Sequence, residues 1–339
     1  MKDSFLAKIT IAFLSVAIFF MAFESIQRIR YAIRYNDASW LRYGFLKKNV
    51  LNREGDLTPG RYGKFTINSK GFRGKEFDAP KKKGVFRIVA IGGSSTFGHE
   101  MTTDKTLTFK MEKICTRTQT GKEVEIINGG VPGKDSDYWA KKFKKRILSI
   151  DPDLILVYIG WNDLRDPITN ILAVKEQRMN KLHKYFIKKS LFYMTLNEKI
   201  SAHLKGNASH VYLKPKTEKD RIATIVEQEK EIMEKYEKNI TKIILEAQKA
   251  GVLVALIKFP YLENSKLYLN ADWVNGVKII FKSIDKLSKN HNVPIIDCTS
   301  KFPKEDTDNL FLDFMHPSEK GNAFMAEIIC QYLAQSKYL

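Results

Sequence analysis

Short, nearly continuous apolar runs alternate with longer amphipathic segments through most of the chain. The runs are rich in Ile, Val and Leu, and the first three are followed by glycine or asparagine. Runs of this length and composition are typical of strands that are buried on both faces. Pro294 cannot donate a ladder hydrogen bond, so the last strand is expected at an edge. We predict five strands, at residues 86–91, 124–127, 154–159, 252–257 and 293–296.

Amphipathic patterns fill the intervals between these runs. They predict helices at residues 104–117, 137–148, 224–249, 271–290 and 319–334. Buried strands that alternate with helices indicate a parallel sheet covered on both faces. The predicted fold class is therefore α/β, a three-layer sandwich with a mainly parallel, flavodoxin-like five-stranded sheet. Ligands of such sheets bind beyond the carboxyl ends of the strands, where the Gly, Ser and Asn clusters of this chain fall.

The N-terminus carries a different pattern, an uncharged apolar run from Ile9 to Phe23. Extension back to Phe5 adds only Lys8, whose long stem can carry its ammonium group to a membrane interface. The stretch approaches the length of a bilayer-spanning helix, so we predict a single-pass transmembrane anchor over residues 5–23. A cleaved signal peptide is the alternative, although no clear small-x-small site follows the run. A buried soluble helix fits least, because the run is apolar on all sides.

Basic residues flank this run on both sides. Lys2 and Lys8 lie before its apolar core, and Arg28, Arg30 and Arg34 follow it. Counted literally, the positive-inside rule would leave the C-terminal part of the chain in the cytoplasm.

The rest of the chain divides into a lead-in or linker at residues 24–84 and a main domain at residues 85–339. Apolar patterning is weak in the lead-in. Residues 164–222 interrupt the alternation of strands and helices as an insertion that mixes basic and aromatic residues. This insertion could cap a site, lie on a membrane, or pack on the domain as a helical excursion.

The charge balance is basic, with 57 Lys and Arg against 38 Asp and Glu and a formal net charge of +19. Such an excess can favour anionic partners, but the lysines are spread along the chain, which is typical of solvated faces. The sequence has no recognised nucleic-acid-binding motif and no Arg-rich stripe, so a nucleic acid is not expected as a partner.

Three cysteines are present, Cys115, Cys298 and Cys330. Their number is odd and no CxxC occurs, so the sequence predicts neither a disulfide framework nor a zinc site. One disulfide remains open. A domain outside the cytoplasm is expected to be stabilised by its core rather than by crosslinks.

The first candidate for chemistry is the turn from Ile91 to Gly98, which follows a predicted strand. Its glycines permit tight backbone turns and a close approach of substrate. Ser94 would point its hydroxyl into the crevice at the strand end. Alternatively, Ser94 or Ser95 only caps the following segment. A phosphate-binding loop is a further alternative, although Gly-Lys-Ser/Thr is absent.

Two more clusters end strands, at residues 128–133 and 160–163. The backbone N–H of Gly130 and the side-chain amide of Asn162 are suitable donors to a developing oxyanion. Taken singly, each cluster is more typical of an ordinary turn, because Gly, Asn and Asp are common turn residues.

Near the C-terminus, Asp313 stands three residues before His316, and no other histidine of the six has an acidic residue in this setting. An Asp at this spacing on a turn can reach Nδ1 of the imidazole and fix its tautomer and orientation. Alone, the pair would be interpreted as a surface histidine that caps the helix near Ser318.

Together and in this order, the clusters resemble the four sequence blocks of the SGNH hydrolase superfamily, also called GDSL-like esterases. The blocks are matched by Ser94, Gly130, Asn162, and Asp313 with His316. The resemblance spans roughly residues 85–334.

One block departs from the family pattern. The family's Gly-Asp-Ser is Gly92-Gly93-Ser94 here, which leaves the triad complete but changes the turn. Ser95 is adjacent to Ser94, and the spacing to Gly98 favours Ser94 as the nucleophile.

The resemblance implies an ester hydrolase with Ser94, His316 and Asp313 as its catalytic triad. It implies an oxyanion hole made by the N–H groups of Ser94 and Gly130 and the amide of Asn162, with no metal or organic cofactor. For an anchored member it implies an external domain that acts on acyl esters, O-acetyl included, of a cell-surface glycan or lipid. An O-acyltransferase would use the same triad, and a non-catalytic glycan-binding module could share the fold. The complete set of residues favours catalysis.

Overall fold

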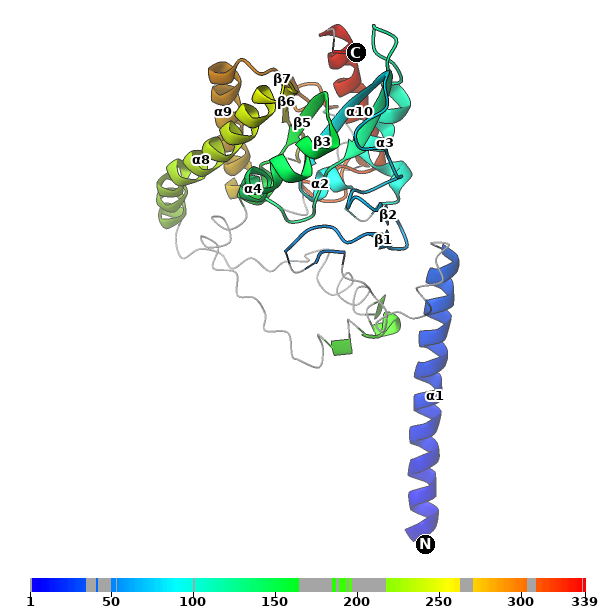
Figure 1. Ribbon diagram of the computed structural model, residues 1–339. Helices are drawn as coiled ribbons and strands as arrows, with labels where there is room; N and C mark the ends of the chain where they lie inside the picture. Colours follow the sequence, from blue (N-terminus) through cyan, green and yellow to red (C-terminus); the bar gives the residue numbers. More distant parts are fainter. Residues whose placement is uncertain are drawn as a thin grey trace. The chain divides into compact units, whose positions relative to one another are not determined.

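The chain forms two compact units in the computed structural model (Figure 1). The larger unit comprises residues 51–60, 64–174 and 212–339, and the smaller comprises residues 1–50, 61–63 and 175–211. The structure describes residues 2–34, 41, 50–52, 54–99, 101–164, 185–186, 189–193, 195–196, 218–262, 271–303, 309–336 and 338–339.

A sheet of five parallel strands lies at the centre of the larger unit (Figure 1). The strands are β3 (Val85–Gly92), β4 (Glu123–Asn128), β5 (Leu154–Tyr158), β6 (Leu253–Lys258) and β7 (Ile295–Asp297). Their order, β4-β3-β5-β6-β7, confirms the predicted flavodoxin-like sheet and places β7 at an edge. Ala90 of β3 is opposite Asn128 of β4 and Leu156 of β5, so the carboxyl ends of these three strands open at the same edge of the sheet.

Helices form a layer on each face of this sheet (Figure 1). One layer holds α3 (Leu107–Ile114) packed on α10 (Glu319–Gln335). The other holds α4 (Ser136–Arg146), α8 (Glu218–Lys249) and α9 (Ala271–His291). Short helical turns complete the unit: α2 (Ser94–Phe97), η2 (Thr103–Lys105), η3 (Leu148–Ile150) and η4 (Trp161–Asp163).

The helix predicted at 104–117 is divided into η2 and α3. Thr106 has an extended backbone there, and its side chain accepts a hydrogen bond from the N–H of Phe109. Thr106 thus caps α3 and starts a new helix, as N-terminal threonines commonly do.

The central strands owe their apolar runs to burial on both faces. Ile88, Val89 and Ile91 of β3 are fully buried, as is every residue of β5. Burial of one such aliphatic side chain stabilises a fold by about 1.5–3 kcal/mol. A strand with a solvated face would have alternated instead.

The predicted lead-in is not a linker over its second half. Residues 51–60 and 64–84 belong to the same compact unit as the sheet, and they include the small strand β2 (Thr66–Ile67) and the first residue of β1 (Gly60–Arg61). Its buried apolar side chains are Leu57, Ile67, Phe72 and Phe77. The boundary predicted at residue 84 therefore does not coincide with a break in packing. These apolar residues are too widely spaced in sequence to form a helical or strand period.

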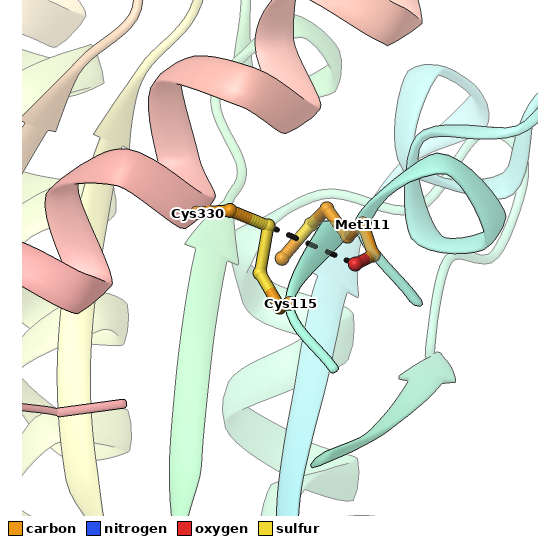
Figure 2. Close-up of a disulfide and its surroundings, with 3 residues drawn as sticks. All are labelled: Met111, Cys115 and Cys330. Atoms are coloured by element: carbon orange, nitrogen blue, oxygen red, sulfur yellow. Dashed lines mark hydrogen bonds between the residues drawn. A yellow bond between two sulfur atoms is a disulfide. The ribbon is translucent and has the colours of Figure 1, made fainter. Parts of the chain in front are cut away.

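A disulfide corrects the expectation of a domain without crosslinks. Cys115 at the end of α3 is bonded to Cys330 of α10, 215 residues later, with Cα atoms 5.5 Å apart (Figure 2). The carbonyl oxygen of Met111 lies 3.7 Å from Cys330 Sγ. The bond ties the two helices of one layer to each other. Cys298 is a buried free thiol.

The smaller unit contains α1 (Lys2–Arg34). Within the described residues, this is the one helix long and apolar enough to cross a membrane, over Ala7–Ile33, and a signal sequence near an N-terminus would pass the same test. Most of the insertion predicted at 164–222 lies outside the described residues, including the basic residues at 178, 181, 184 and 188.

Candidate active site

Ser94 is the first residue of α2, and only Gly93 separates it from the end of β3. Two glycines make room for this turn. A Cβ on Gly92 would lie 2.3 Å from the carbonyl oxygen of Tyr158, and a Cβ on Gly93 would lie 2.4 Å from Asn162 Nδ2. Position 93, where the sequence departs from the expected Asp, thus lets the amide of Asn162 approach the backbone next to Ser94.

The side chains of Ser94, His316 and Asp313 form a continuous hydrogen-bonded chain. Ser94 Oγ lies 2.7 Å from His316 Nε2, and His316 Nδ1 lies 2.6 Å from Asp313 Oδ2. The three residues predicted from sequence as a triad are therefore brought together across 222 positions of the chain.

A tight turn holds the acid and the imidazole. Asp313 Oδ1 accepts hydrogen bonds from the backbone N–H groups of Met315 and His316, both at 2.8 Å. Burial acts to raise the pKa of Asp313, but its hydrogen bonds and the charge of His316 outweigh burial and lower that pKa. Asp313 is consequently an ionised carboxylate at neutral pH and can orient the imidazole.

Asn162 lies in η4, directly after β5, and its Nδ2 donates one hydrogen bond of 2.9 Å to the carbonyl of Lys134. A primary amide has two N–H donors, and this bond uses one of them. The bond to Lys134 also places residues 133–134 beside Asn162.

Gly130 is not placed as predicted. Its N–H donates a hydrogen bond of 3.0 Å to Asn128 Oδ1, and the residue is buried. A Cβ on Gly130 would lie 2.2 Å from the backbone nitrogen of Phe97, so the position requires glycine for its packing against α2. Gly133 differs: it is exposed, has a φ of +73° and faces open space. In the part of the chain that the structure describes, the N–H of Gly133 donates no hydrogen bond.

The model of the GDSL-like lipase/acylhydrolase family matches residues 90–324, a span that contains every residue of this site. The chain belongs to this family. It is a hydrolase that acts on ester bonds, which confirms the enzyme class and the family predicted from the four clusters. None of the curated proteins matches the sequence.

Several solved structures are similar to this GDSL-like hydrolase. One is described as a GDSL-like lipase from Parabacteroides merdae, with 14% identity, a TM-score of 0.48 and coverage of 74% of this chain and 96% of that one. The acetylxylan esterase Axe2 from Geobacillus stearothermophilus has 14% identity and a TM-score of 0.46, over 73% of this chain and 93% of that one. A lipase/acylhydrolase from Enterococcus faecalis has 18% identity and a TM-score of 0.45, over 74% and 96%.

Ser95 of the hydrolase has a separate place from its neighbour. It is 7% exposed, and its hydroxyl donates a hydrogen bond of 3.1 Å to the carbonyl of Met315. Of the two serines, it is Ser94 whose hydroxyl oxygen lies against His316 Nε2.

Asp163 was not predicted, although it completes the Gly-Trp-Asn-Asp cluster. Its carboxylate accepts hydrogen bonds from the backbone N–H of Ser136, at 3.1 and 3.2 Å, and from the Ser136 hydroxyl. With the bond between Asn162 and Lys134, this contact ties the end of β5 to the start of α4. Burial raises the pKa of Asp163 to about 7, although the bonds from Ser136 act to lower it.

Two further residues near the site were missed. The imidazole of His99, exposed at the end of the α2 turn, has its centroid 5.6 Å from that of His316. The guanidinium of buried Arg73 donates hydrogen bonds of 2.7 Å to the carbonyls of Phe97, Gly98 and Met101. His99 could have been suspected from its place directly after Gly98, whereas nothing local marks Arg73.

Proposed function

We propose that Ser94, His316 and Asp313 are the catalytic triad of this ester hydrolase. The observation that carries the proposal is the pair of short contacts, 2.7 Å between Ser94 Oγ and His316 Nε2 and 2.6 Å between His316 Nδ1 and Asp313 Oδ2. Both lie within the range of a nucleophile, its base and the group that orients the base.

In the first half of the reaction, Ser94 Oγ attacks the ester carbonyl and transfers its proton to His316 Nε2. The imidazolium then protonates the leaving alcohol, and an acyl-serine remains. In the second half, His316 removes a proton from water as the water attacks the acyl-serine. Collapse of the tetrahedral intermediate releases the carboxylic acid and returns the proton to Ser94. Asp313 stabilises the imidazolium in both halves.

The proposed oxyanion donors are the N–H of Ser94, the free N–H of the Asn162 amide and the N–H of Gly133. Gly133 replaces Gly130 in this role, because the N–H of Gly130 is already bonded to Asn128. Gly133 precedes Lys134, whose carbonyl is bonded to Asn162, so the two donors lie on adjoining loops. Donors of this kind stabilise the charge that develops on the carbonyl oxygen.

We propose further that the hydrolase domain faces an oxidising compartment and that α1 anchors it to the membrane. The disulfide between Cys115 and Cys330 supports this location, since such bonds persist outside the cytoplasm. The basic residues that follow the apolar run of α1 favour a cytoplasmic domain by the positive-inside rule. Large domains, however, are translocated largely regardless of flanking charge. An enzyme in this place could reach a cell-surface glycan or lipid. Its proposed substrates are acyl esters of such a molecule, including O-acetyl esters.

The test is hydrolysis of p-nitrophenyl acetate by the full-length protein in detergent micelles. Ser94→Ala and His316→Ala are each expected to abolish turnover without lowering the unfolding temperature. Ser149→Ala is the matched control, because Ser149 is exposed and precedes β5, at the opposite end of the sheet. A near-parental rate in Ser94→Ala would refute the proposed nucleophile. A parental enzyme that transfers acyl groups to sugar hydroxyls but hydrolyses no ester would refute the hydrolytic assignment.

A further inference from the structure

Glu24 is an acidic residue at the end of the apolar part of α1, and each of its two carboxylate oxygens has two hydrogen-bond or ion-pair partners. It accepts hydrogen bonds from Ser190 Oγ at 2.7 Å, from the N–H of Leu191 at 3.1 Å and from the N–H of Phe192 at 2.9 Å. It also pairs with Arg28 one turn later, at 2.6 Å. The side chain of Glu24 is 19% exposed. One carboxylate of α1 thus caps a turn that lies more than 160 positions further along the chain.

An aromatic contact lies beside this cap. The ring of Phe192 is 5.8 Å from that of Phe20 and 5.3 Å from that of Phe23. Phe20 and Phe23 are the last aromatic residues of the uncharged run, before Glu24 and Arg28 bring charge to α1. The turn at 190–192 is therefore docked at the level where the apolar part of α1 ends.

The neighbouring side chains are apolar and exposed. Tyr185 is 57% exposed, Phe186 is 43% exposed and Leu196 is 40% exposed. Phe20 of α1, whose ring contacts that of Phe192, is likewise 49% exposed. Aromatic side chains are enriched at membrane interfaces, and apolar side chains of amphipathic segments enter the boundary between headgroups and acyl chains.

We propose that α1 is retained in the mature protein and that the exposed side chains of Tyr185, Phe186 and Leu196 make a second membrane contact. These side chains lie in the interface of the lipid bilayer, and Glu24 holds the neighbouring turn at 190–192 beside the end of the apolar run. Removal of α1 as a leader would leave the three donors of residues 190–192 without their shared acceptor, which is costly for buried groups. The proposal rests on α1 spanning the membrane and is independent of the catalytic residues.

The lipid bilayer is favoured as the occupant because the exposed side chains adjoin a helix whose own apolar surface requires lipid. A helix of 27 residues such as Ala7–Ile33 is about 40 Å long, enough for the hydrocarbon core and part of an interface. The carboxylate of Glu24 and the guanidinium of Arg28 would then lie at the headgroup level, where charged groups are tolerated.

The test measures membrane depth with nitroxide labels on single added cysteines in the full-length protein. The vesicles contain phosphatidylcholine and phosphatidylglycerol, and collisions with oxygen and with an aqueous nickel complex are compared. Phe186→Cys reports the proposed contact, Phe13→Cys the middle of the apolar run of α1, and Leu245→Cys the exposed surface of α8. Selective labelling is expected, because Cys298 is buried and the other two cysteines are paired.

The label at position 186 is expected to be several-fold less accessible to nickel than the label at 245, and shallower than the label at 13. If the labels at 186 and 245 are equally accessible to nickel while the label at 13 is protected, the second membrane contact is refuted and the transmembrane anchor stands. A label at 13 that is open to nickel would overturn both. A mature chain whose intact mass lacks the residues before Glu24 would overturn retention. Hydrolysis of a soluble ester by the same samples reports separately on the proposed function.

Glu24→Ala tests the cap itself. It is expected to raise nickel accessibility at 186 towards the value at 245, because the turn at 190–192 loses its acceptor. Glu231→Ala, at an exposed position of α8, is the matched control and should change nothing. Unchanged accessibility in Glu24→Ala would show that the carboxylate does not hold the segment at the membrane.

Discussion

Ser95 Oγ donates a hydrogen bond of 3.1 Å to the carbonyl of Met315, so the residue after the proposed nucleophile holds the residue before the proposed base. The contact links α2 to the turn that carries His316, two parts of the site separated by more than 200 residues. Asp313 holds the same turn from within, through the N–H groups of Met315 and His316. The distance between Ser94 and His316 therefore depends on one bond between the two segments as well as on the turn itself.

Ser95→Ala is expected to lower kcat by about 2- to 10-fold with KM unchanged, the scale of one lost hydrogen bond. The measurement is the steady-state hydrolysis of p-nitrophenyl acetate, and Ser95→Thr, which keeps a hydroxyl, is the matched comparison. Loss of all activity in Ser95→Ala, with activity retained in Ser94→Ala, would exchange the roles of the two serines. An unchanged kcat would show that the contact positions nothing.

Asn162→Ala is expected to lower kcat by about 10²- to 10³-fold, because one donor to the oxyanion is removed. The unfolding temperature should change little, since the amide makes a single hydrogen bond to a loop carbonyl. Kinetics and thermal unfolding of the same samples separate these effects. A small kinetic effect would exclude Asn162 from the oxyanion hole.

Gly130→Ala is expected to act on stability. The added Cβ would lie 2.2 Å from the backbone nitrogen of Phe97, and overpacking of this kind costs about 1–3 kcal/mol or more. Denaturant unfolding measures the loss. Gly133→Ala is the comparison: its Cβ would meet open space, and only the strain of a positive φ remains. Equal stability of Gly130→Ala and the parent would contradict the packing role.

The parent is expected to lose unfolding free energy relative to the Asp163→Asn variant as pH rises from about 4 to about 7. The pKa of Asp163 is raised to about 7 in the folded protein, against about 4 when unfolded, so the folded state binds the proton more tightly. Its contribution to stability is complete below about pH 4 and is lost as pH rises towards 7. The asparagine variant has no such titration. The check is thermal unfolding of both proteins across this range, and parallel curves would contradict the raised pKa.

Loss of the disulfide is expected to lower the free energy of unfolding by about 2–5 kcal/mol, because the bond closes a loop of 215 residues. Denaturant unfolding of the double variant Cys115→Ser, Cys330→Ser measures this loss, and the parent in reductant should match it. Activity at low temperature should persist, since neither cysteine belongs to the site. Alkylation of all three cysteines in protein that is denatured without reductant would show that the bond is absent.

The sequence alone determined the sheet and much of the site, because both depend on local patterns. The burial of β3 and β5 on both faces demands continuous apolar runs, which are visible without any tertiary information. Ser94, Asn162, Asp313 and His316 could be found because each lies in a short motif at a strand end or a turn. The rule that carboxyl ends of parallel strands share one edge predicted that the Gly, Ser and Asn clusters lie together. The contact of Asp313 and His316 with Ser94 was implied by the resemblance to the family.

Only the tertiary structure decided which groups are already engaged. Gly130 and Gly133 are both glycines of one loop, and only the bond to Asn128 shows that the first has no donor to offer. The pairing of Cys115 with Cys330 and the reach of Arg73 to the end of α2 join segments far apart in sequence. Neither leaves a local period or motif, because a contact between distant segments is set by how helices pack on the sheet. The cap of Glu24 on residues 190–192 belongs to the same class.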